Sequence, residues 1–172
     1  MVERKIDFSY LVFCWQDDSP DNAYYLDRKT GDVRLVNQHL LDLRQLTDEI
    51  EKDRERYLYV PKPDKTDMLS DLHDFQHEVS SEQLKRLLSV AFESPHVLLA
   101  FKKILQDDQE QSQHLREFLE ERVAKRIETW LNANSVARVW AVDEEDLEDP
   151  DENEDYDDEI DDKDSARLNF GV

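Results

Sequence analysis

The chain contains very little glycine and cysteine, and both shortages exclude whole classes of functional site. Only two of its 172 residues are glycine, which excludes glycine-rich phosphate loops and dinucleotide-binding fingerprints. The single cysteine, Cys14, excludes an internal disulfide and any metal site built from several thiolates, and it suits a reducing compartment. No Gly-x-Ser-x-Gly nucleophile elbow occurs either. We therefore expect a protein that is not an enzyme and that binds no cofactor or metal.

A long apolar run is also missing. The run Tyr10–Trp15 is too short for the core of a signal peptide and far too short to span a bilayer. We therefore expect a soluble cytoplasmic protein with no membrane partner.

Negative charge, in contrast, is abundant and unevenly divided. The segment from Asp143 to Asp164 has 16 acidic residues and one lysine, a net charge of −15 out of −21 for the whole chain, which leaves −6 for the rest. Such a segment buries too little apolar area to offset the entropy lost on ordering. The sequence predicts a single domain over residues 1–142 and an acidic disordered tail over residues 143–172.

The charge also predicts the kind of partner. A negative field repels phosphate backbones, so it disfavours direct nucleic-acid binding and favours a basic partner protein. Beyond the acidic run lie two large apolar residues, Leu168 and Phe170. Acidic steering followed by an apolar anchor is a sensible design for peptide recognition, and it resembles in style the acidic tails of bacterial single-stranded DNA-binding proteins.

Strand signals lie mainly in the N-terminal part of the chain. Ile6–Trp15 is rich in aromatic and β-branched residues and predicts a strand. Ala23–Leu26 and Val33–Val36 predict a hairpin, in which Gly31 supplies the positive φ that the turn needs. Tyr57–Val60 predicts a short strand that the following prolines stop.

Helical spacing begins at Leu40–Ile50 and dominates after Pro63. The helices predicted after Pro63 are Met68–Val79, a helix capped by Ser80 with Gln83, Val97–Leu105 with its cap at Ser94-Pro95, and a last helix that Asp107 or Asp108 opens and that runs to about Leu131. Val136–Val142 fits either a closing strand or a continuation of that helix. Strands first and helices afterwards predict an α+β fold, with a small antiparallel sheet packed by about four to five helices.

Four motifs and a C-terminal signature stand out once these elements are placed. They are Tyr24-Tyr25-Leu26-Asp27 with Thr30-Gly31-Asp32-Val33, Tyr57-Leu58-Tyr59-Val60-Pro61-Lys62-Pro63-Asp64, Asp74-Phe75, Phe101-Lys102-Lys103-Ile104-Leu105, and the series Phe118, Glu121, Arg122, Arg126, Trp130 and Leu131. Together they resemble a small bacterial family known only as an uncharacterised protein family, over about Tyr24–Leu131. Leu115 and Leu119 stand where that family usually has a tryptophan and an arginine. The resemblance implies no activity, because the family has none established.

Two arginines lie on the apolar face of the last predicted helix. At about 100° per residue, Arg122 and Arg126 fall between Phe118 and Trp130. An arginine on a core-facing stripe needs a carboxylate partner, an exposed edge or a pocket. Arg122, Arg126 and Trp130 are therefore the candidate site. It is either a structural ion pair or a place where two guanidinium groups receive a carboxylate or phosphate.

A possible internal partner lies on the Met68–Val79 helix. Four acidic residues line one narrow stripe of that helix: Asp67, Asp71, Asp74 and Glu78. Like charges repel unless a positive group faces them, so we expect Arg122 and Arg126 to face this stripe, with Asp74 and Arg126 as the first pair to test. A divalent cation is disfavoured there, because oxygen-only sites usually draw their ligands from a shaped loop.

These observations leave three functions open. The leading interpretation is a non-enzymatic cytoplasmic interaction module that binds a basic protein through its tail. The first alternative is a nucleic-acid mimic that inhibits a DNA- or RNA-handling protein, which would bind with a steep salt dependence. The second is a small-ligand or anion-binding protein that uses Arg122, Arg126 and Trp130.

Overall fold

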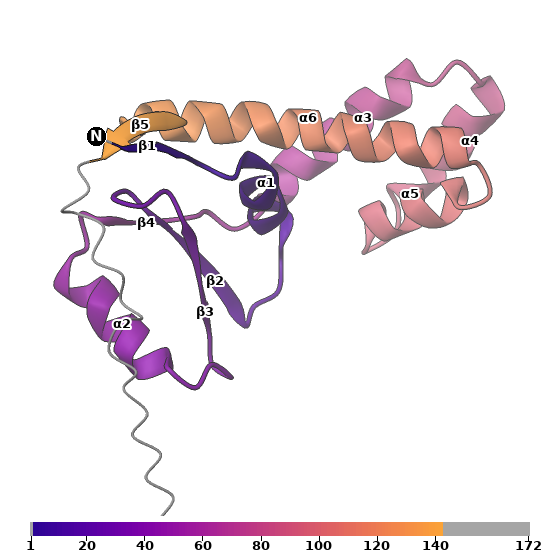
Figure 1. The fold of residues 1–172 in the computed structure, drawn as a ribbon. Helices are drawn as coiled ribbons and strands as arrows, with labels where there is room; N and C mark the ends of the chain where they lie inside the picture. Colours follow the sequence, from indigo (N-terminus) through magenta and orange to yellow (C-terminus); the bar gives the residue numbers. More distant parts are fainter. Residues whose placement is uncertain (1, 143–172) are drawn as a thin grey trace, which may run out of the picture.

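The computed structural model describes residues 2–142, which form an α+β fold of five strands and six helices (Figure 1). In chain order the elements are β1 (Val2–Lys5), α1 (Phe8–Gln16), β2 (Asn22–Asp27), β3 (Val33–Asn37), α2 (Leu43–Lys52), β4 (Tyr57–Tyr59), α3 (Lys65–Glu78), α4 (Glu82–Ala91), α5 (Val97–Leu105), α6 (Gln109–Ala133) and β5 (Val139–Val142). The predicted α+β class is confirmed. The predicted acidic tail, residues 143–172, lies outside the described residues.

The strands form two small antiparallel sheets. The larger has the order β3-β2-β4, with Tyr25 of β2 opposite Arg34 on one side and Tyr59 on the other. The predicted hairpin is confirmed, and Gly31 in its turn has a φ of 79°, a conformation that costs glycine little because it lacks a Cβ. The smaller sheet pairs β1 with β5, so residues 139–142 form the closing strand, the first of the two predicted possibilities.

The strand predicted over Ile6–Trp15 is wrong, because most of that segment forms helix α1. The Asp7 carboxylate accepts a hydrogen bond from the Tyr10 backbone N–H at 3.0 Å and caps the helix. Helical spacing then turns Leu11 and Cys14 into the core, where both are buried. The aromatic and β-branched composition that favours a strand is therefore overridden by burial of one helical face against the rest of the protein.

Two predicted helix starts also need correction. Ser81, one residue after the predicted cap at Ser80, accepts the hydrogen bond from the Leu84 backbone N–H at 3.2 Å and begins α4. Helix α5 begins after His96 and not at Ser94-Pro95; the Ser94 hydroxyl instead accepts from the His96 N–H in the preceding turn. The start of α6 at Asp108 is confirmed, since its carboxylate accepts from the Gln111 N–H.

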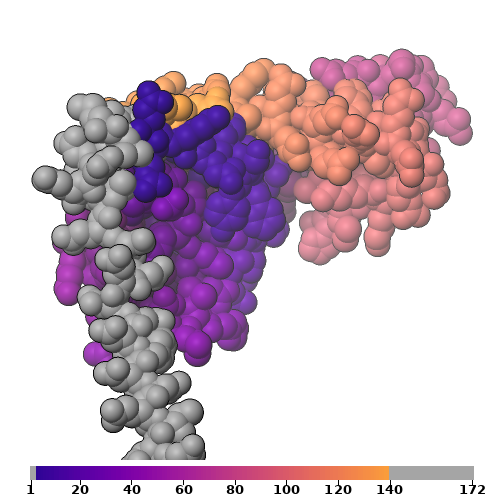
Figure 2. Space-filling view, viewed as in Figure 1, coloured from indigo at the N-terminus to yellow at the C-terminus, as the bar shows by residue number. Residues whose placement is uncertain are grey.

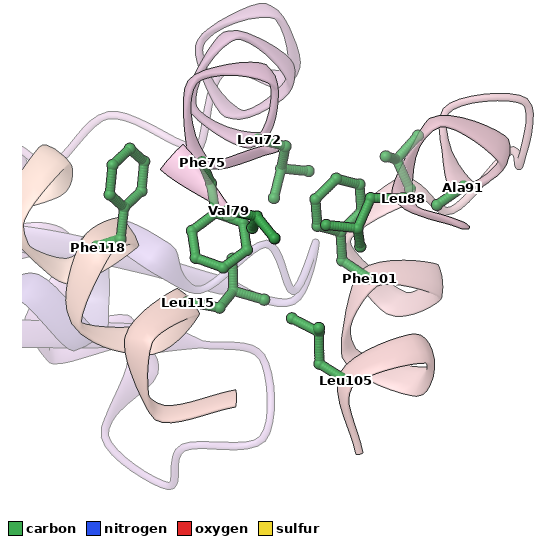
Figure 3. Close-up of a cluster of buried hydrophobic side chains, with 10 residues drawn as sticks. Leu72, Phe75, Val79, Leu88, Ala91, Phe101, Leu105, Leu115 and Phe118 are labelled. Carbon is green, nitrogen blue, oxygen red and sulfur yellow. The ribbon is translucent and has the colours of Figure 1, made fainter. Parts of the chain in front are cut away.

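Helix α6 joins two hydrophobic clusters. The sheet cluster lies around α1, β2 and the C-terminal half of α6, and its buried members are Ile6, Leu11, Cys14, Tyr24, Leu26, Val60, Ile127 and Leu131. The helix cluster brings together α3, α4, α5 and the N-terminal half of α6 (Figure 3), and its buried members are Leu72, Phe75, Val79, Leu88, Ala91, Val97, Phe101, Leu105, Leu115 and Phe118. Figure 1 shows α6 running from the β1–β5 pair at one end to α4 and α5 at the other.

Two carboxylates stabilise the turns beside the larger sheet by accepting hydrogen bonds. Asp27, which is buried, accepts two hydrogen bonds from the Arg56 guanidinium at 2.8 and 2.7 Å. Burial alone would raise the pKa of Asp27, but the hydrogen bonds from Arg56 and from the Lys29 backbone outweigh it and hold this pKa below its usual range. Asp17 accepts from the Tyr24 hydroxyl at 2.6 Å, and this bond with others lowers the pKa of Asp17 to about 2.

Candidate functional site

The core of the candidate site is an ion pair between α6 and α3. The Arg126 guanidinium donates to both Asp71 carboxylate oxygens, at 2.6 and 2.7 Å. Asp71 is only 3% exposed, so its charge depends on this bidentate partner. The hydrogen bonds to Asp71 raise the pKa of Arg126 above its ordinary value. This pair links α3 to α6 through the most buried carboxylate of the acidic stripe.

The remaining acidic residues of the stripe pair in antiparallel order along α6. Asp67 lies 3.7 Å from the Arg126 Nε, and Asp74 lies 3.0 Å from an Arg122 nitrogen. Further along, Glu78 approaches His114 at 3.5 Å. Helices α3 and α6 therefore pack antiparallel, since later residues of α3 contact earlier residues of α6. This geometry corrects the predicted Asp74–Arg126 pair, because Asp74 faces Arg122 and Arg126 faces Asp71.

The three residues proposed as one site, Arg122, Arg126 and Trp130, lie in three different environments. The Arg122 guanidinium lies over the Phe118 ring, 4.9 Å from its centroid. The Trp130 ring instead packs edge-on against Trp15, with centroids 5.4 Å apart, beside the sheet cluster. A carboxylate or phosphate could therefore not meet all three side chains at once in this arrangement.

A cavity of about 320 Å³ lies beside Arg126, between the end of α1 and helices α3, α5 and α6. Its lining includes the apolar side chains Trp15, Met68, Leu98, Leu119 and Val123 and the charged side chains Asp64, Asp67, Asp71, Lys102, Arg116, Glu120 and Arg126. Within residues 2–142, no carboxylate lies within 4.0 Å of Lys102 or Arg116. Lys102 belongs to one of the motifs noted in the sequence, but no sequence pattern relates it to Arg116, because the two come from different helices that only the fold brings to one cavity.

The rest of the described chain offers little for catalysis or metal binding. Burial raises the pKa of the Cys14 thiol to about 11, so it remains protonated at neutral pH and is a poor nucleophile. Within residues 2–142, no group of three or more histidine, cysteine, aspartate or glutamate side chains is placed to hold a metal ion. In the same range, every helix is too short or too polar to cross a membrane. The predicted anchor residues Leu168 and Phe170 lie outside the described residues.

Comparison with known proteins identifies a family. The family model described as Uncharacterised protein family (UPF0158) matches residues 4–156. This match extends further in both directions than the similarity over Tyr24–Leu131, and it includes the first part of the acidic segment, up to Tyr156. No curated protein and no solved structure matches the chain.

Proposed function

Because the chain belongs to the Uncharacterised protein family (UPF0158), whose description names no activity, we propose from its own residues that it is a non-enzymatic interaction module that binds a basic protein in the bacterial cytoplasm. The observation that carries this proposal is the net charge of −15 between Asp143 and Asp164. A run of carboxylates this dense attracts positively charged surfaces and accelerates their encounter. Leu168 and Phe170 then supply the apolar contacts that charge alone does not.

The ion pairs of the described part support this choice of partner. The arginines most suited to an anionic ligand, Arg122 and Arg126, each contact a carboxylate of α3. Acidic side chains on another face of α6, in particular Glu120, remain exposed to solvent. A positively charged protein therefore meets attraction from the body of the protein as well as from its acidic segment.

A small-anion function is the second candidate, and the cavity beside Arg126 favours it. Lys102 and Arg116 line this cavity and could receive a carboxylate or phosphate. Such a function would survive deletion of residues 143–172 and fail when Arg116 is replaced by alanine. The interaction module would instead lose its partner when residues 143–172 are deleted and keep it when Arg116 is replaced by alanine.

Affinity purification with cross-linking from the native host tests the leading proposal. The full chain is compared with a variant that lacks residues 143–172 and with a Phe170→Ala variant. We expect a basic protein that is cross-linked to the full chain, lost on deletion, and strongly weakened by Phe170→Ala with little change in the salt dependence.

The full chain and these two variants also distinguish the nucleic-acid mimic from the interaction module. A mimic would capture a nucleic-acid-binding protein that nucleic acid displaces, and its affinity would fall steeply with salt whether or not Phe170 is present. An unchanged set of partners after deletion of residues 143–172 would refute the leading proposal.

A further inference from the structure

A second hollow adjoins the cavity beside Arg126 on a neighbouring face of α6, where α1 packs against it, and Gln16 and Glu120 line both. It has a volume of about 470 Å³, and its apolar wall includes Phe8, Val12, Phe13 and Ala124. In Figure 2 the indigo surface of the N-terminal segment adjoins the orange surface of α6 on the face shown. The hollow therefore combines residues from two helices that are about a hundred positions apart in the sequence.

One aromatic residue at this hollow, Phe13, is more exposed than folding requires, whereas Phe8 is half-buried and packs against the sheet cluster. Phe13 is 59% exposed, and its ring stacks on that of Tyr10 at 6.0 Å between centroids. The opposite face of α1 already supplies Leu11 and Cys14 to the sheet cluster, so Phe13 adds little to the core. A large aromatic side chain kept in water beside a hollow is typical of a surface that binds another molecule.

The charged side chains that line the hollow are all acidic, although the Arg138 guanidinium lies over the Phe8 ring at one end, 4.0 Å from its centroid. Glu117, Glu120 and Glu121 line it, and the lining includes no lysine or arginine. Glu117 and Glu121 are four residues apart on one helix, a spacing at which like charges repel. Within residues 2–142, no cation lies within 4.0 Å of Glu120, whereas Glu121 lies 3.3 Å from Lys125. A positively charged group arriving here would relieve this repulsion.

We propose that this hollow binds a segment of a basic partner protein, in which a large apolar side chain is flanked by lysine or arginine. The apolar side chain enters between Phe8, Val12 and Phe13, and the flanking cations meet Glu117, Glu120 and Glu121. This proposal rests on the proposed function, since it names the place on the folded body where the basic partner docks.

Charge also decides against two other occupants. The acidic segment of the same chain, with 16 carboxylates from Asp143 to Asp164, would be repelled by the glutamate rim. A second copy that docked face to face would bring two such rims together. Only an occupant with positive charge complements both the apolar wall and its border.

The test is a binding experiment with the intact ¹⁵N-labelled protein, followed by amide chemical shifts. The probe is the synthetic peptide Lys-Lys-Phe-Leu-Lys-Lys, with Glu-Glu-Phe-Leu-Glu-Glu and Lys-Lys-Ser-Ser-Lys-Lys as controls. We expect the first peptide to shift amides of Phe8–Gln16 and Glu117–Ala124, and to bind at least about fivefold more tightly than either control, because apolar and ionic contacts are both needed.

Matched variants locate the contact. Phe13→Ser should weaken the first peptide by about tenfold, and Glu120→Lys by about two- to fivefold. Leu41→Ser and Glu55→Lys are the controls, because they make comparable chemical changes at exposed positions away from the hollow. If specific contacts and not the overall charge of the protein decide binding, these two variants should bind the first peptide within about twofold of the unaltered protein.

Three outcomes would overturn the docking site. Shifts confined to residues 143–164 would refute the hollow while leaving the proposed function intact. Equal binding of the lysine- and glutamate-flanked peptides would refute the hollow and remove the charge argument for the proposed function as well. Self-association of the free protein that Phe13→Ser abolishes would identify a second copy as the occupant.

Discussion

The pair between Asp71 and Arg126 should respond very differently to loss of one partner than to loss of the other. Replacing Arg126 by methionine keeps an unbranched apolar stem but leaves the Asp71 carboxylate, 3% exposed, without a cation. An uncompensated buried charge costs about 3–5 kcal/mol. Replacing Asp71 by asparagine leaves an arginine whose side chain is 30% exposed and still 3.7 Å from Asp67. Its cost should be about 2 kcal/mol, the range of one charge-assisted hydrogen bond.

Urea unfolding at pH 7, followed by far-ultraviolet circular dichroism, measures these free energies. The Arg126→Met/Asp71→Asn double variant should be more stable than the sum of the two single losses predicts, by at least about 1 kcal/mol, because it removes both charges together. The pair of Arg122 and Asp74 is the control. Its side chains are 37% and 46% exposed, so its coupling should stay below about 1 kcal/mol.

Two results would refute this reasoning. Additive losses for Asp71 and Arg126 would mean that the two side chains do not stabilise the protein as a pair. A loss below about 1 kcal/mol for Arg126→Met would mean that water reaches Asp71, since solvation then replaces the lost partner.

Three further predictions follow from single groups. Ser81→Ala should destabilise the protein by about 1 kcal/mol in urea unfolding, whereas Ser80→Ala should have almost no effect, because only Ser81 caps α4. The pKa values of Asp17 and Asp27 are lowered in the folded protein, so their contribution to stability is present above about pH 4 and is lost in acid titration as pH falls through each lowered pKa, which for Asp17 is about 2. Cys14, buried with a pKa of about 11, should react with a thiol reagent at pH 8 only as fast as the protein unfolds.

Each of these three predictions would be contradicted by one experimental result. Equal losses for the two serine variants would place the cap of α4 elsewhere. If the pH midpoint of acid unfolding does not change when Asp17 is replaced by asparagine, protonation of Asp17 does not contribute to acid unfolding. Fast labelling of Cys14 in the absence of urea would show that the thiol is accessible in the folded state.

Local signals in the sequence predict much of this fold. The hairpin around Gly31 was predictable because a turn with positive φ favours glycine. The start of α6 at Asp108 was predictable because an aspartate that precedes a helical pattern is a strong cap. The α+β fold class was predictable from the order of the strands and helices along the chain.

Helix α1 was mispredicted because two local signals conflict. Aromatic and β-branched residues favour a strand, whereas Asp7 and the burial of Leu11 and Cys14 favour a helix. Contact with α6 decides in favour of the helix, and local reasoning has no access to that contact. The error also concealed the hollow beside Phe13, which exists only if α1 is a helix.

The candidate site shows a similar limit. Spacing along one helix predicts that Asp67, Asp71 and Asp74 share a stripe, but the partner of each depends on the direction and register of α6. Only antiparallel packing places Arg126 against Asp71 and Arg122 against Asp74. Local signals do not relate Lys102 to Arg116, because their common cavity depends on how α1, α3, α5 and α6 pack together.

The central claim is that this protein recognises a basic protein through acidic and apolar surfaces, and hydrogen–deuterium exchange of the intact chain with its captured partner tests it most directly. The account predicts that the partner slows amide exchange in Phe8–Gln16, Glu117–Ala124 and residues 143–170, and that the partner's own protected segment is rich in lysine or arginine. Slowed exchange confined to the residues that line the cavity beside Arg126, or a partner whose protected segment is acidic, would contradict it.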